Sequence, residues 1–258
     1  MSMAEGFTAR QLMPGVFHIA DPLGVHATLL TGGQRALLFD AGHGIHDLCD
    51  YVRGLTGLPV TLVLSHGHHD HALGAIHFPE ALILPEDLQV VQAYTLDPVR
   101  ERVAKRAALT PEATQKYRQA PMPRLKVPEE DNFELGGLSA RLLRMPGHTP
   151  GSAALYVPQL KLLLTGDNWN PVTWLFFPEA LPAEAYSASM RGVLALPFKW
   201  ALTPHHGRLI RRGLMERYIQ GLTREAFSRA LPVLIPDYED IPTKEVFPSP
   251  GFKLVFRA

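Results

Sequence analysis

The sequence of 258 residues predicts an α/β fold made of two similar halves. Short apolar runs rich in β-branched residues alternate along the chain with stretches of helical character. A group of strands followed by helices occurs twice, which indicates two halves of the same kind. The apolar fraction of 46% is sufficient for a sizeable core in a chain of this length.

The first part of the chain predicts several short strands and one helix. Turn signals separate the strand-like segments, which are 16–19, 26–30 and 35–39. A helix is predicted over 45–54, because Asp47 and Asp50 lie near its start. Residues 60–64 are an apolar, partly β-branched run of strand length, which is typical of a buried strand.

The remaining chain predicts further strands and helices. Residues 97–119 are expected to form two helices, because Asp97-Pro98 and Thr110-Pro111 both match an N-cap residue followed by proline. Strands are expected at 81–84, 138–143, 153–157, 161–164, 200–203 and 246–256. Helices are expected at 183–195 and 208–230, and a loop rich in tryptophan, phenylalanine and proline at 169–182.

The composition argues against several classes of partner. The chain has 25 basic and 25 acidic side chains, so no overall charge attracts it to nucleic acid or to an anionic membrane. No apolar run approaches the length of a membrane span, and the N-terminal residues lack the pattern of a signal peptide. Cys49 is the only cysteine, which excludes an internal disulfide. We therefore expect a cytoplasmic protein with a small-molecule substrate.

The segment just after the predicted strand 60–64 has the chemistry of a metal site. It places potential ligands at His66, His68, Asp70 and His71. Imidazole and carboxylate suit Zn²⁺, Mn²⁺ or Fe²⁺, and the distant single cysteine excludes a thiolate cage. On an extended loop, residues 66, 68 and 70 point the same way, and a helix starting there turns His71 to a neighbouring position. The segment can thus supply ligands to two adjacent metals.

Three later segments place further ligands after predicted strands. His148 lies between a proline-glycine and a threonine-proline pair, Asp167 ends one strand, and His205-His206 end another. Each alone has an ordinary interpretation as a turn, cap or surface residue. Together with the first segment they supply the ligands that two metals need.

At these residues the sequence resembles the metallo-β-lactamase fold superfamily. The motifs occur in the family's order, as Asp40-Ala41-Gly42, the segment 66–71, His148, Asp167 and His206, and the match spans residues 16 to about 207. The resemblance implies an αββα sandwich with the metals at one edge between two sheets. We expect one domain over 1–258, with a helical insert at about 97–120 and a C-terminal extension at about 208–258.

The resemblance also implies a role for each ligand. The first metal would be bound by His66, His68 and His148, and the second by Asp70, His71 and His206, with Asp167 bridging both. The closing histidine of the family directly precedes glycine, which favours His206 over His205. Asp40 is expected to orient a ligand rather than to bind metal. His69 occupies a variable position and is left unassigned.

The implied activity is metal-dependent hydrolysis. Two divalent ions, zinc first and manganese or iron as alternatives, would hold a hydroxide that attacks an ester, thioester, lactone or phosphoester. Asp70 is the candidate catalytic residue, because it can orient the nucleophile and accept its proton. Two alternatives stay open: a persulfide-dioxygenase-like enzyme with one iron, and a binding protein without activity on the same fold.

Two segments are candidates for contacts with the substrate or with a partner. The aromatic segment 169–178 directly follows Asp167 and is expected either to line the pocket or to lie in the core or in a homodimer contact. The basic segment 98–119 is interpreted mainly as a solvated face, with an anionic substrate as the alternative. The sequence identifies no substrate-binding residue.

Overall fold

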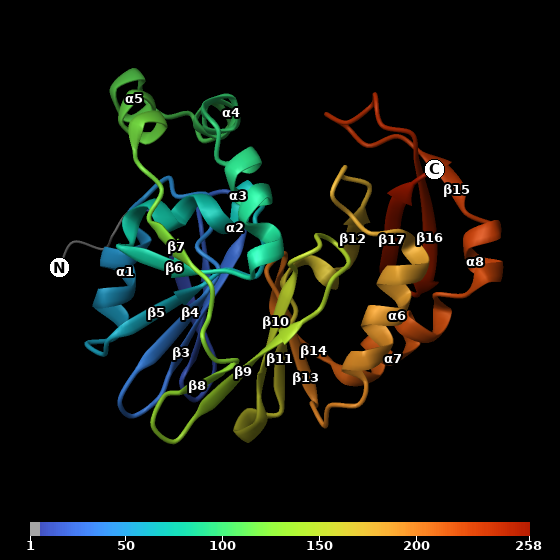
Figure 1. The fold of residues 1–258 in the computed structure, drawn as a ribbon, viewed down its shortest axis with the longest axis horizontal. Helices are drawn as coiled ribbons and strands as arrows, with labels where there is room; N and C mark the ends of the chain where they lie inside the picture. Colours follow the sequence, from blue (N-terminus) through green and yellow to red (C-terminus); the bar gives the residue numbers. More distant parts are fainter. Residues whose placement is uncertain (1–5) are drawn as a thin grey trace. The chain divides into compact units, whose positions relative to one another are not determined.

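The computed structural model describes residues 6–258 and divides the chain into two compact units. The first unit ends at Leu142 and the second begins at Leu143, so the division falls within β9 (Ser139–Arg144). In Figure 1 the first unit has the blue to green colours and the second the yellow to red colours. The expectation of a single domain over 1–258 stays a prediction.

The first unit contains a seven-stranded sheet whose strands follow the order of the chain. The strands are β1 (Thr8–Met13), β2 (Val16–Ala20), β3 (His26–Thr31), β4 (Ala36–Phe39), β5 (Val60–Val63), β6 (Glu80–Leu82) and β7 (Arg124–Lys126). Neighbours from β1 to β4 are antiparallel, and those from β4 to β7 are parallel. Leu29, Leu38 and Leu62 belong to its fully buried core. The carboxyl ends of the parallel strands lie at the same edge of the sheet, and open α/β sheets usually bind their ligands at this edge.

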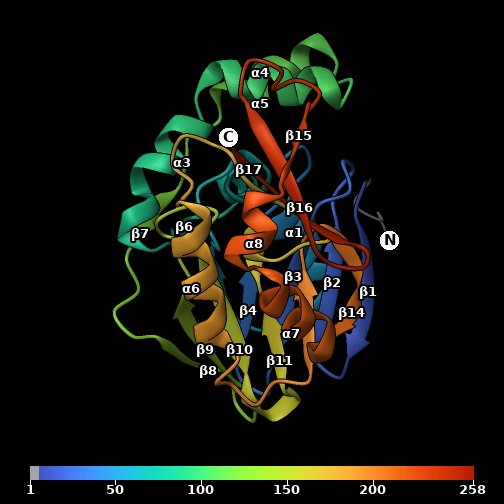
Figure 2. The same cartoon turned by 90° about the vertical axis from the view of Figure 1, so that its right-hand side faces the viewer.

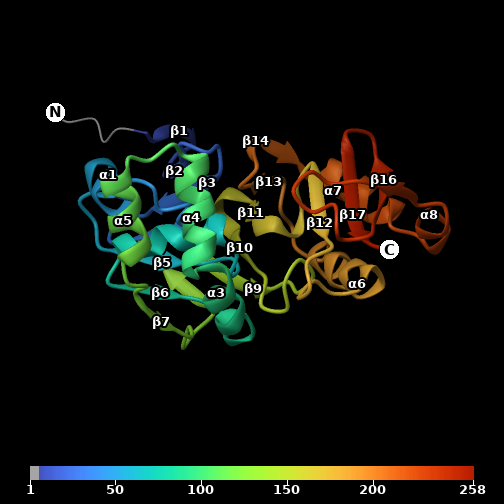
Figure 3. The same ribbon diagram turned by 90° about the horizontal axis from the view of Figure 1, so that it is seen from above.

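Helices connect the parallel strands of the first unit. They are α1 (Leu48–Leu55), α2 (His69–Ala72), α3 (Leu88–Tyr94), α4 (Asp97–Arg106) and α5 (Pro111–Gln119). The Asp47 side chain accepts a hydrogen bond from the backbone N–H of Asp50, and Thr110 caps α5 in the same way. The two predicted helices within 97–119 are thus confirmed as α4 and α5, which contact each other (Figure 3). The unit closes with β8 (Asn132–Glu134), which pairs with β9.

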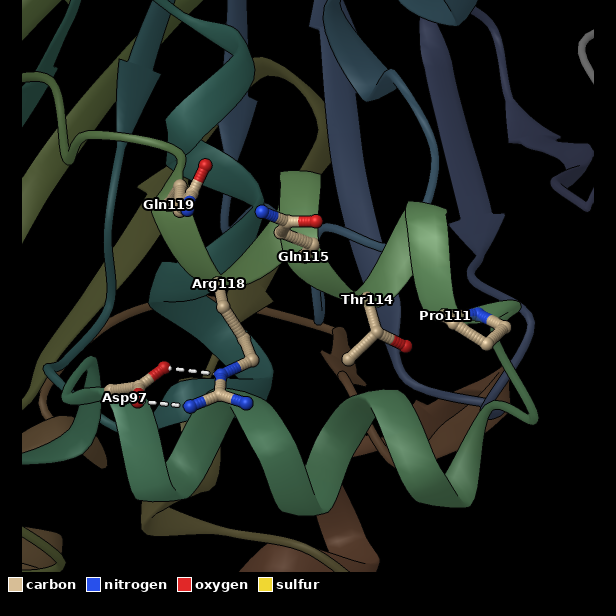
Figure 4. A pocket seen from close by; sticks show the side chains of 6 residues that line it. All are labelled: Asp97, Pro111, Thr114, Gln115, Arg118 and Gln119. Carbon is tan, nitrogen blue, oxygen red and sulfur yellow. Dashed lines mark hydrogen bonds and ion pairs between the residues drawn. The ribbon is translucent and has the colours of Figure 1, made fainter.

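One buried guanidinium fastens α4 to the chain around it. Arg100 is 4% exposed and donates hydrogen bonds to the carbonyl oxygens of Thr95, Tyr117 and Ala120. Figure 4 shows a second arginine, Arg118, which forms a two-pronged ion pair with Asp97 at a pocket on the surface between the two helices. Both arginines link the same helices, but only Arg100 is removed from solvent.

This difference predicts unequal effects on stability. Arg100→Met is expected to lower the free energy of unfolding by about 2–4 kcal/mol, because it leaves buried carbonyl oxygens without a donor. The matched variant Arg118→Met should cost about 0–1 kcal/mol, since solvent screens an exposed ion pair. Chemical denaturation of both variants measures the difference, and equal effects would contradict this account of Arg100.

The second unit contains two groups of strands. One has the order β14-β13-β11-β10, formed by β10 (Ala153–Val157), β11 (Leu162–Leu164), β13 (Trp200–Thr203) and β14 (His206–Arg211). The other has the order β12-β17-β16-β15, formed by β12 (Val172–Leu175), β15 (Leu231–Val233), β16 (Thr243–Ser249) and β17 (Phe252–Arg257). The helices are α6 (Ala183–Val193), α7 (Arg212–Gly221) and α8 (Arg224–Ser228), and α7 and α8 both contact β16 (Figure 2).

The structure corrects three predictions for the second unit. The helix expected over 208–230 is instead β14, α7 and α8, because the chain after Pro204-His205 turns back and pairs with β13 before any helix begins. The loop expected at 169–182 contains β12, which pairs with β17 from the distant C-terminal end. The strand expected at 246–256 is a hairpin, and Gly251 has a φ of +77° at its turn.

The described residues also bear on the membrane expectation. Within 6–258, the structure contains no helix with both the length and the apolar character needed to cross a membrane.

Candidate metal centre

Asp40 and Ser65 meet at the ends of two parallel strands in the first unit. Asp40 directly follows β4, Ser65 comes shortly after β5, and these strands are paired in parallel. The backbone N–H of Ser65 donates to Asp40 Oδ1 at 2.7 Å, and both residues are buried. Asp40 has a φ of +67°, a left-handed conformation that aspartate tolerates better than most residues. The local backbone therefore turns the Asp40 carboxylate toward the segment that begins at Ser65.

The four ligands predicted in this segment lie close together in pairs. Suitable ligand atoms of His66 and His68 lie within 4.8 Å of each other, and the same holds for Asp70 and His71. The chain is extended at His68 and then enters α2, so the expected change from loop to helix is present. His66, His68 and His71 are buried, whereas Asp70 is partly exposed. The first unit thus assembles two pairs of donors next to each other along the chain.

Asp40 orients two of these histidines. His71 Nδ1 donates to Asp40 Oδ2 at 3.0 Å, and Ser65 Oγ donates to the same oxygen at 2.9 Å. Because the Ser65 hydroxyl proton is used in this way, its oxygen accepts the hydrogen bond from His66 Nδ1 at 2.9 Å. Both rings therefore carry their proton on Nδ1, which leaves Nε2 as the atom with the lone pair that a metal requires. The donor set fits a divalent metal such as zinc.

Gly67 and Asp87 hold the loop between the first two ligands. The backbone N–H of Gly67 donates to the buried carboxylate of Asp87 at 2.8 Å. A Cβ at position 67 would lie 2.5 Å from the backbone nitrogen of Val91, so this loop passes too close to α3 for any larger residue. The position of His66 and His68 therefore depends on a glycine and a carboxylate that bind no metal themselves.

A second carboxylate–histidine pair lies beside this segment. His43 Nδ1 is 2.6 Å from Asp21 Oδ2, and its ring contacts the His69 ring edge-on at 5.6 Å between centroids. Burial of the Asp21 carboxyl opposes ionisation, yet the hydrogen bonds and charge of His43 lower the pKa of Asp21 overall. Burial lowers the pKa of His69 to about 4, so the His69 ring is neutral at pH 7.

In the second unit, His148 is held by its backbone and by its ring. The backbone N–H donates to Asn168 Oδ1 at 2.9 Å, and Nδ1 donates to the carbonyl oxygen of Trp174 at 2.6 Å. Nε2 is therefore again the atom with the lone pair, and it lies 3.7 Å from Asp167 Oδ2. The Nε2 atom of His148 and the carboxylate of Asp167 are therefore close enough to bind the same ion.

The structure places His205, the neighbour of the predicted ligand His206, next to Asp167. His205 Nε2 lies 3.2 Å from both carboxylate oxygens of Asp167. His206 opens β14 and pairs with Thr203 of β13. The sequence offered no signal in favour of His205 beyond its place beside His206. The closing ligand thus stays a prediction, with two adjacent candidates.

The metallo-beta-lactamase superfamily model matches residues 20–210 of this chain. The chain belongs to this superfamily. The predicted α/β fold, an αββα sandwich of the metallo-β-lactamase type, is confirmed, and so is the prediction that the protein is a hydrolase enzyme.

The chain is similar to a curated enzyme and to several solved structures. Acyl-coenzyme A thioesterase MBLAC2 of Gallus gallus is 26% identical over 243 residues, which cover 86% of this chain and 82% of the relative. TTHA1623, solved in a di-iron-bound form, is 27% identical with a TM-score of 0.56, covering 76% of this chain and 94% of that one. The sec-alkylsulfatase Pisa1 from Pseudomonas sp. is 16% identical with a TM-score of 0.63, covering 86% of this chain and 43% of that one.

The aromatic segment 169–178 of this superfamily member has two different environments. Trp169 is fully buried and stacks on Phe252 with 5.0 Å between ring centroids, so it belongs to the core and not to a pocket wall. Phe177 is partly exposed, and its ring meets the His148 imidazole edge-on at 6.0 Å. The core interpretation therefore applies to Trp169, whereas Phe177 lies beside the predicted ligand His148 and stays a candidate for the pocket wall.

Sequence reasoning missed three polar residues that support the ligands. Ser65 bonds to His66, Asn168 bonds to His148, and Asn170 donates to Asp167. Each lies within three residues of a predicted ligand along the chain, but none belongs to a recognised motif. A search for short polar side chains beside the predicted ligands would have found Ser65 and Asn168.

Proposed function

We propose that this protein is a binuclear metal-dependent hydrolase that cleaves acyl thioesters. The observation that carries the proposal is the oriented donor set, in which His66, His71 and His148 all use Nδ1 for a protein hydrogen bond. The similarity to acyl-coenzyme A thioesterases supports the thioester within the wider group of esters, lactones and phosphoesters.

The proposed ligand set follows the order of the superfamily's motifs. One ion would be held by His66, His68 and His148, and the other by Asp70, His71 and His206, with Asp167 shared. When bound, two divalent ions supply an activated water and a Lewis acid for the carbonyl oxygen. Zinc is the proposed metal, and the di-iron form of a relative keeps iron as the alternative.

The side chains of this protein would then direct the reaction. Asp70 is partly exposed and can accept a hydrogen bond from the attacking water and afterwards its proton. That proton can pass to the departing thiolate, so the thioester bond breaks to a carboxylic acid and a thiol. Asp40 keeps His71 in one tautomer throughout, because its carboxylate accepts a hydrogen bond from the Nδ1–H group.

Metal analysis separates this proposal from its alternatives. Protein purified without added metal is expected to contain about two metals per chain, measured by inductively coupled plasma mass spectrometry. One iron per chain with oxygen consumption on a persulfide would instead support the dioxygenase-like enzyme. No metal after reconstitution with zinc would support a binding protein without activity.

A substrate panel tests the thioester. Acyl-coenzyme A thioesters should be hydrolysed at least tenfold faster, by kcat/KM, than the oxygen ester of the same acyl group, an aryl lactone or a phosphodiester. Chelator-treated protein and the double variant His66→Ala/His68→Ala are the controls and should be inactive. Preference for the lactone or phosphodiester would overturn the thioester assignment and leave the hydrolase in place.

The identity of the closing ligand can be decided with a matched pair of variants. The family's motif predicts that His206→Ala loses one zinc per chain and most activity, whereas His205→Ala keeps both. The contact between His205 and Asp167 predicts the reverse. Zinc stoichiometry of the two variants, purified in parallel, is the measurement. If both variants retain two zinc ions, neither His205 nor His206 is the closing ligand.

The setting of the enzyme completes the proposal. A single cysteine and balanced charge fit a cytoplasmic protein that acts on a small molecule without nucleic acid or membrane partners. The proposal includes a homodimer, and light scattering of the purified protein measures the oligomeric state.

A further inference from the structure

Asn170 lies beside the carboxylate that the proposed function makes a shared ligand. It follows Asp167 by three residues, is 2% exposed, and its Nδ2 donates to Asp167 Oδ1 at 3.0 Å. The contact involves no backbone atom of Asp167, so it acts on the orientation of the carboxylate alone. The proposed ligand roles do not use Asn170.

The orientation of the Asn170 amide follows from chemistry. An ionised carboxylate only accepts hydrogen bonds, so the NH₂ end of the amide must face Asp167. Among residues 6–258 no group donates to Asn170 Oδ1, although this oxygen is buried. A buried amide with one end unsatisfied is unusual for a side chain that only fills space, and such groups often serve a site.

The backbone around Asn170 is fixed on both sides. Its backbone N–H donates to Thr173 Oγ1 at 3.1 Å, and that hydroxyl donates back to the Asn170 carbonyl oxygen at 3.2 Å. On the other side, Thr165 Oγ1 donates to the carbonyl oxygen of Trp169 at 3.1 Å. With the backbone held in this way, the Asn170 side chain has a defined position from which to hold a neighbour.

We propose that Asn170 is a positioning residue that sets the rotamer of Asp167. Its amide N–H holds Oδ1, while Oδ2 lies on the side of His148 Nε2, 3.7 Å away. The two oxygens of a carboxylate move as one rigid group, so a hydrogen bond that holds Oδ1 also fixes the direction of Oδ2. This inference rests on the proposed function, because it takes Asp167 as a metal ligand.

The test replaces the amide with an apolar group of similar shape. Asn170→Leu should weaken zinc binding about 10- to 100-fold, the range for loss of a group that orients a ligand. Competition with a chromogenic chelator measures the affinity. The Co²⁺-substituted protein should also show a changed visible absorption spectrum. The metal-free variant should unfold at the temperature of metal-free wild type, or above it, because the unsatisfied oxygen is removed together with the donor.

A second variant guards against misfolding and supplies a rescue. Asn170→Ser keeps a hydroxyl donor and should bind zinc with an affinity between those of Asn170→Leu and wild type. Wild-type affinity and an unchanged Co²⁺ spectrum in Asn170→Leu would overturn the inference, as would a drop in metal-free stability that matches the loss of affinity. If wild type itself binds no zinc, the proposed function fails and takes this inference with it.

Discussion

Asp70→Asn is expected to lower kcat for thioester hydrolysis about 10³-fold, within the range for loss of a group that transfers a proton. The amide has nearly the same shape as the carboxylate, but it cannot accept a proton at neutral pH. It is also a weaker ligand than a carboxylate for a divalent metal. Steady-state kinetics on an acyl-coenzyme A thioester, with zinc stoichiometry measured on the same sample, gives the result.

The zinc measurement separates two causes of the lost activity. A variant that keeps both metals and still loses kcat supports the proton-transfer role, whereas loss of one zinc supports the ligand role alone. Asp47→Asn is the matched control, since the Asp47 side chain caps α1 by accepting a hydrogen bond from the backbone N–H of Asp50, and an amide oxygen can accept the same bond. An Asp70→Asn enzyme with wild-type kcat would refute the role proposed for Asp70.

Trp169→Ala is expected to lower the free energy of unfolding by about 3–5 kcal/mol, the usual cost of removing a large buried aromatic side chain. Trp169 is fully buried, stacks on Phe252, and meets Tyr218 edge-on at 6.3 Å. The cavity left behind cannot close easily, because its neighbours are large rings on other elements. Denaturant titration followed by circular dichroism measures the change.

Phe247 provides the matched control for this core residue. It is also an aromatic residue of the second unit, but it is 63% exposed on β16. Phe247→Ala should change the free energy of unfolding by less than about 0.5 kcal/mol, as is usual for surface substitutions. A small effect of Trp169→Ala would contradict the core role of Trp169 and would support the alternative that Trp169 lines the pocket.

Local signals in the sequence were sufficient for many elements. The pairs Asp97-Pro98 and Thr110-Pro111 predicted two helices, and α4 and α5 begin at Asp97 and Pro111. Thr110 is the N-cap of α5 as predicted, but the N-cap of α4 is Leu96, so Asp97 is the first helical residue and not the predicted cap. The apolar run 60–64 predicted the strand that precedes the metal segment. These features depend on neighbouring residues, so a single sequence contains the information.

Features that depend on distant partners were harder to predict. β12 exists because Val172 to Leu175 pair in parallel with β17, which is about 80 residues further along the chain. β14 was predicted as helix, since its strand character comes from pairing with β13. The same limit applies to the candidate site, where the contacts of His205 and Asn170 with Asp167 depend on side-chain directions that no motif specifies.

The hydrogen bonds of Asp40 would limit which substitutions the proposed metal ligands can tolerate during evolution. One carboxylate oxygen serves His71 directly and His66 through Ser65. In the proposed assignment these two histidines belong to different ions. A single substitution at Asp40 would therefore disturb both ions at once, and compensation would have to arise at two places together. Adaptation to another metal is easier through His148, whose ring is anchored to a backbone carbonyl that every residue type possesses.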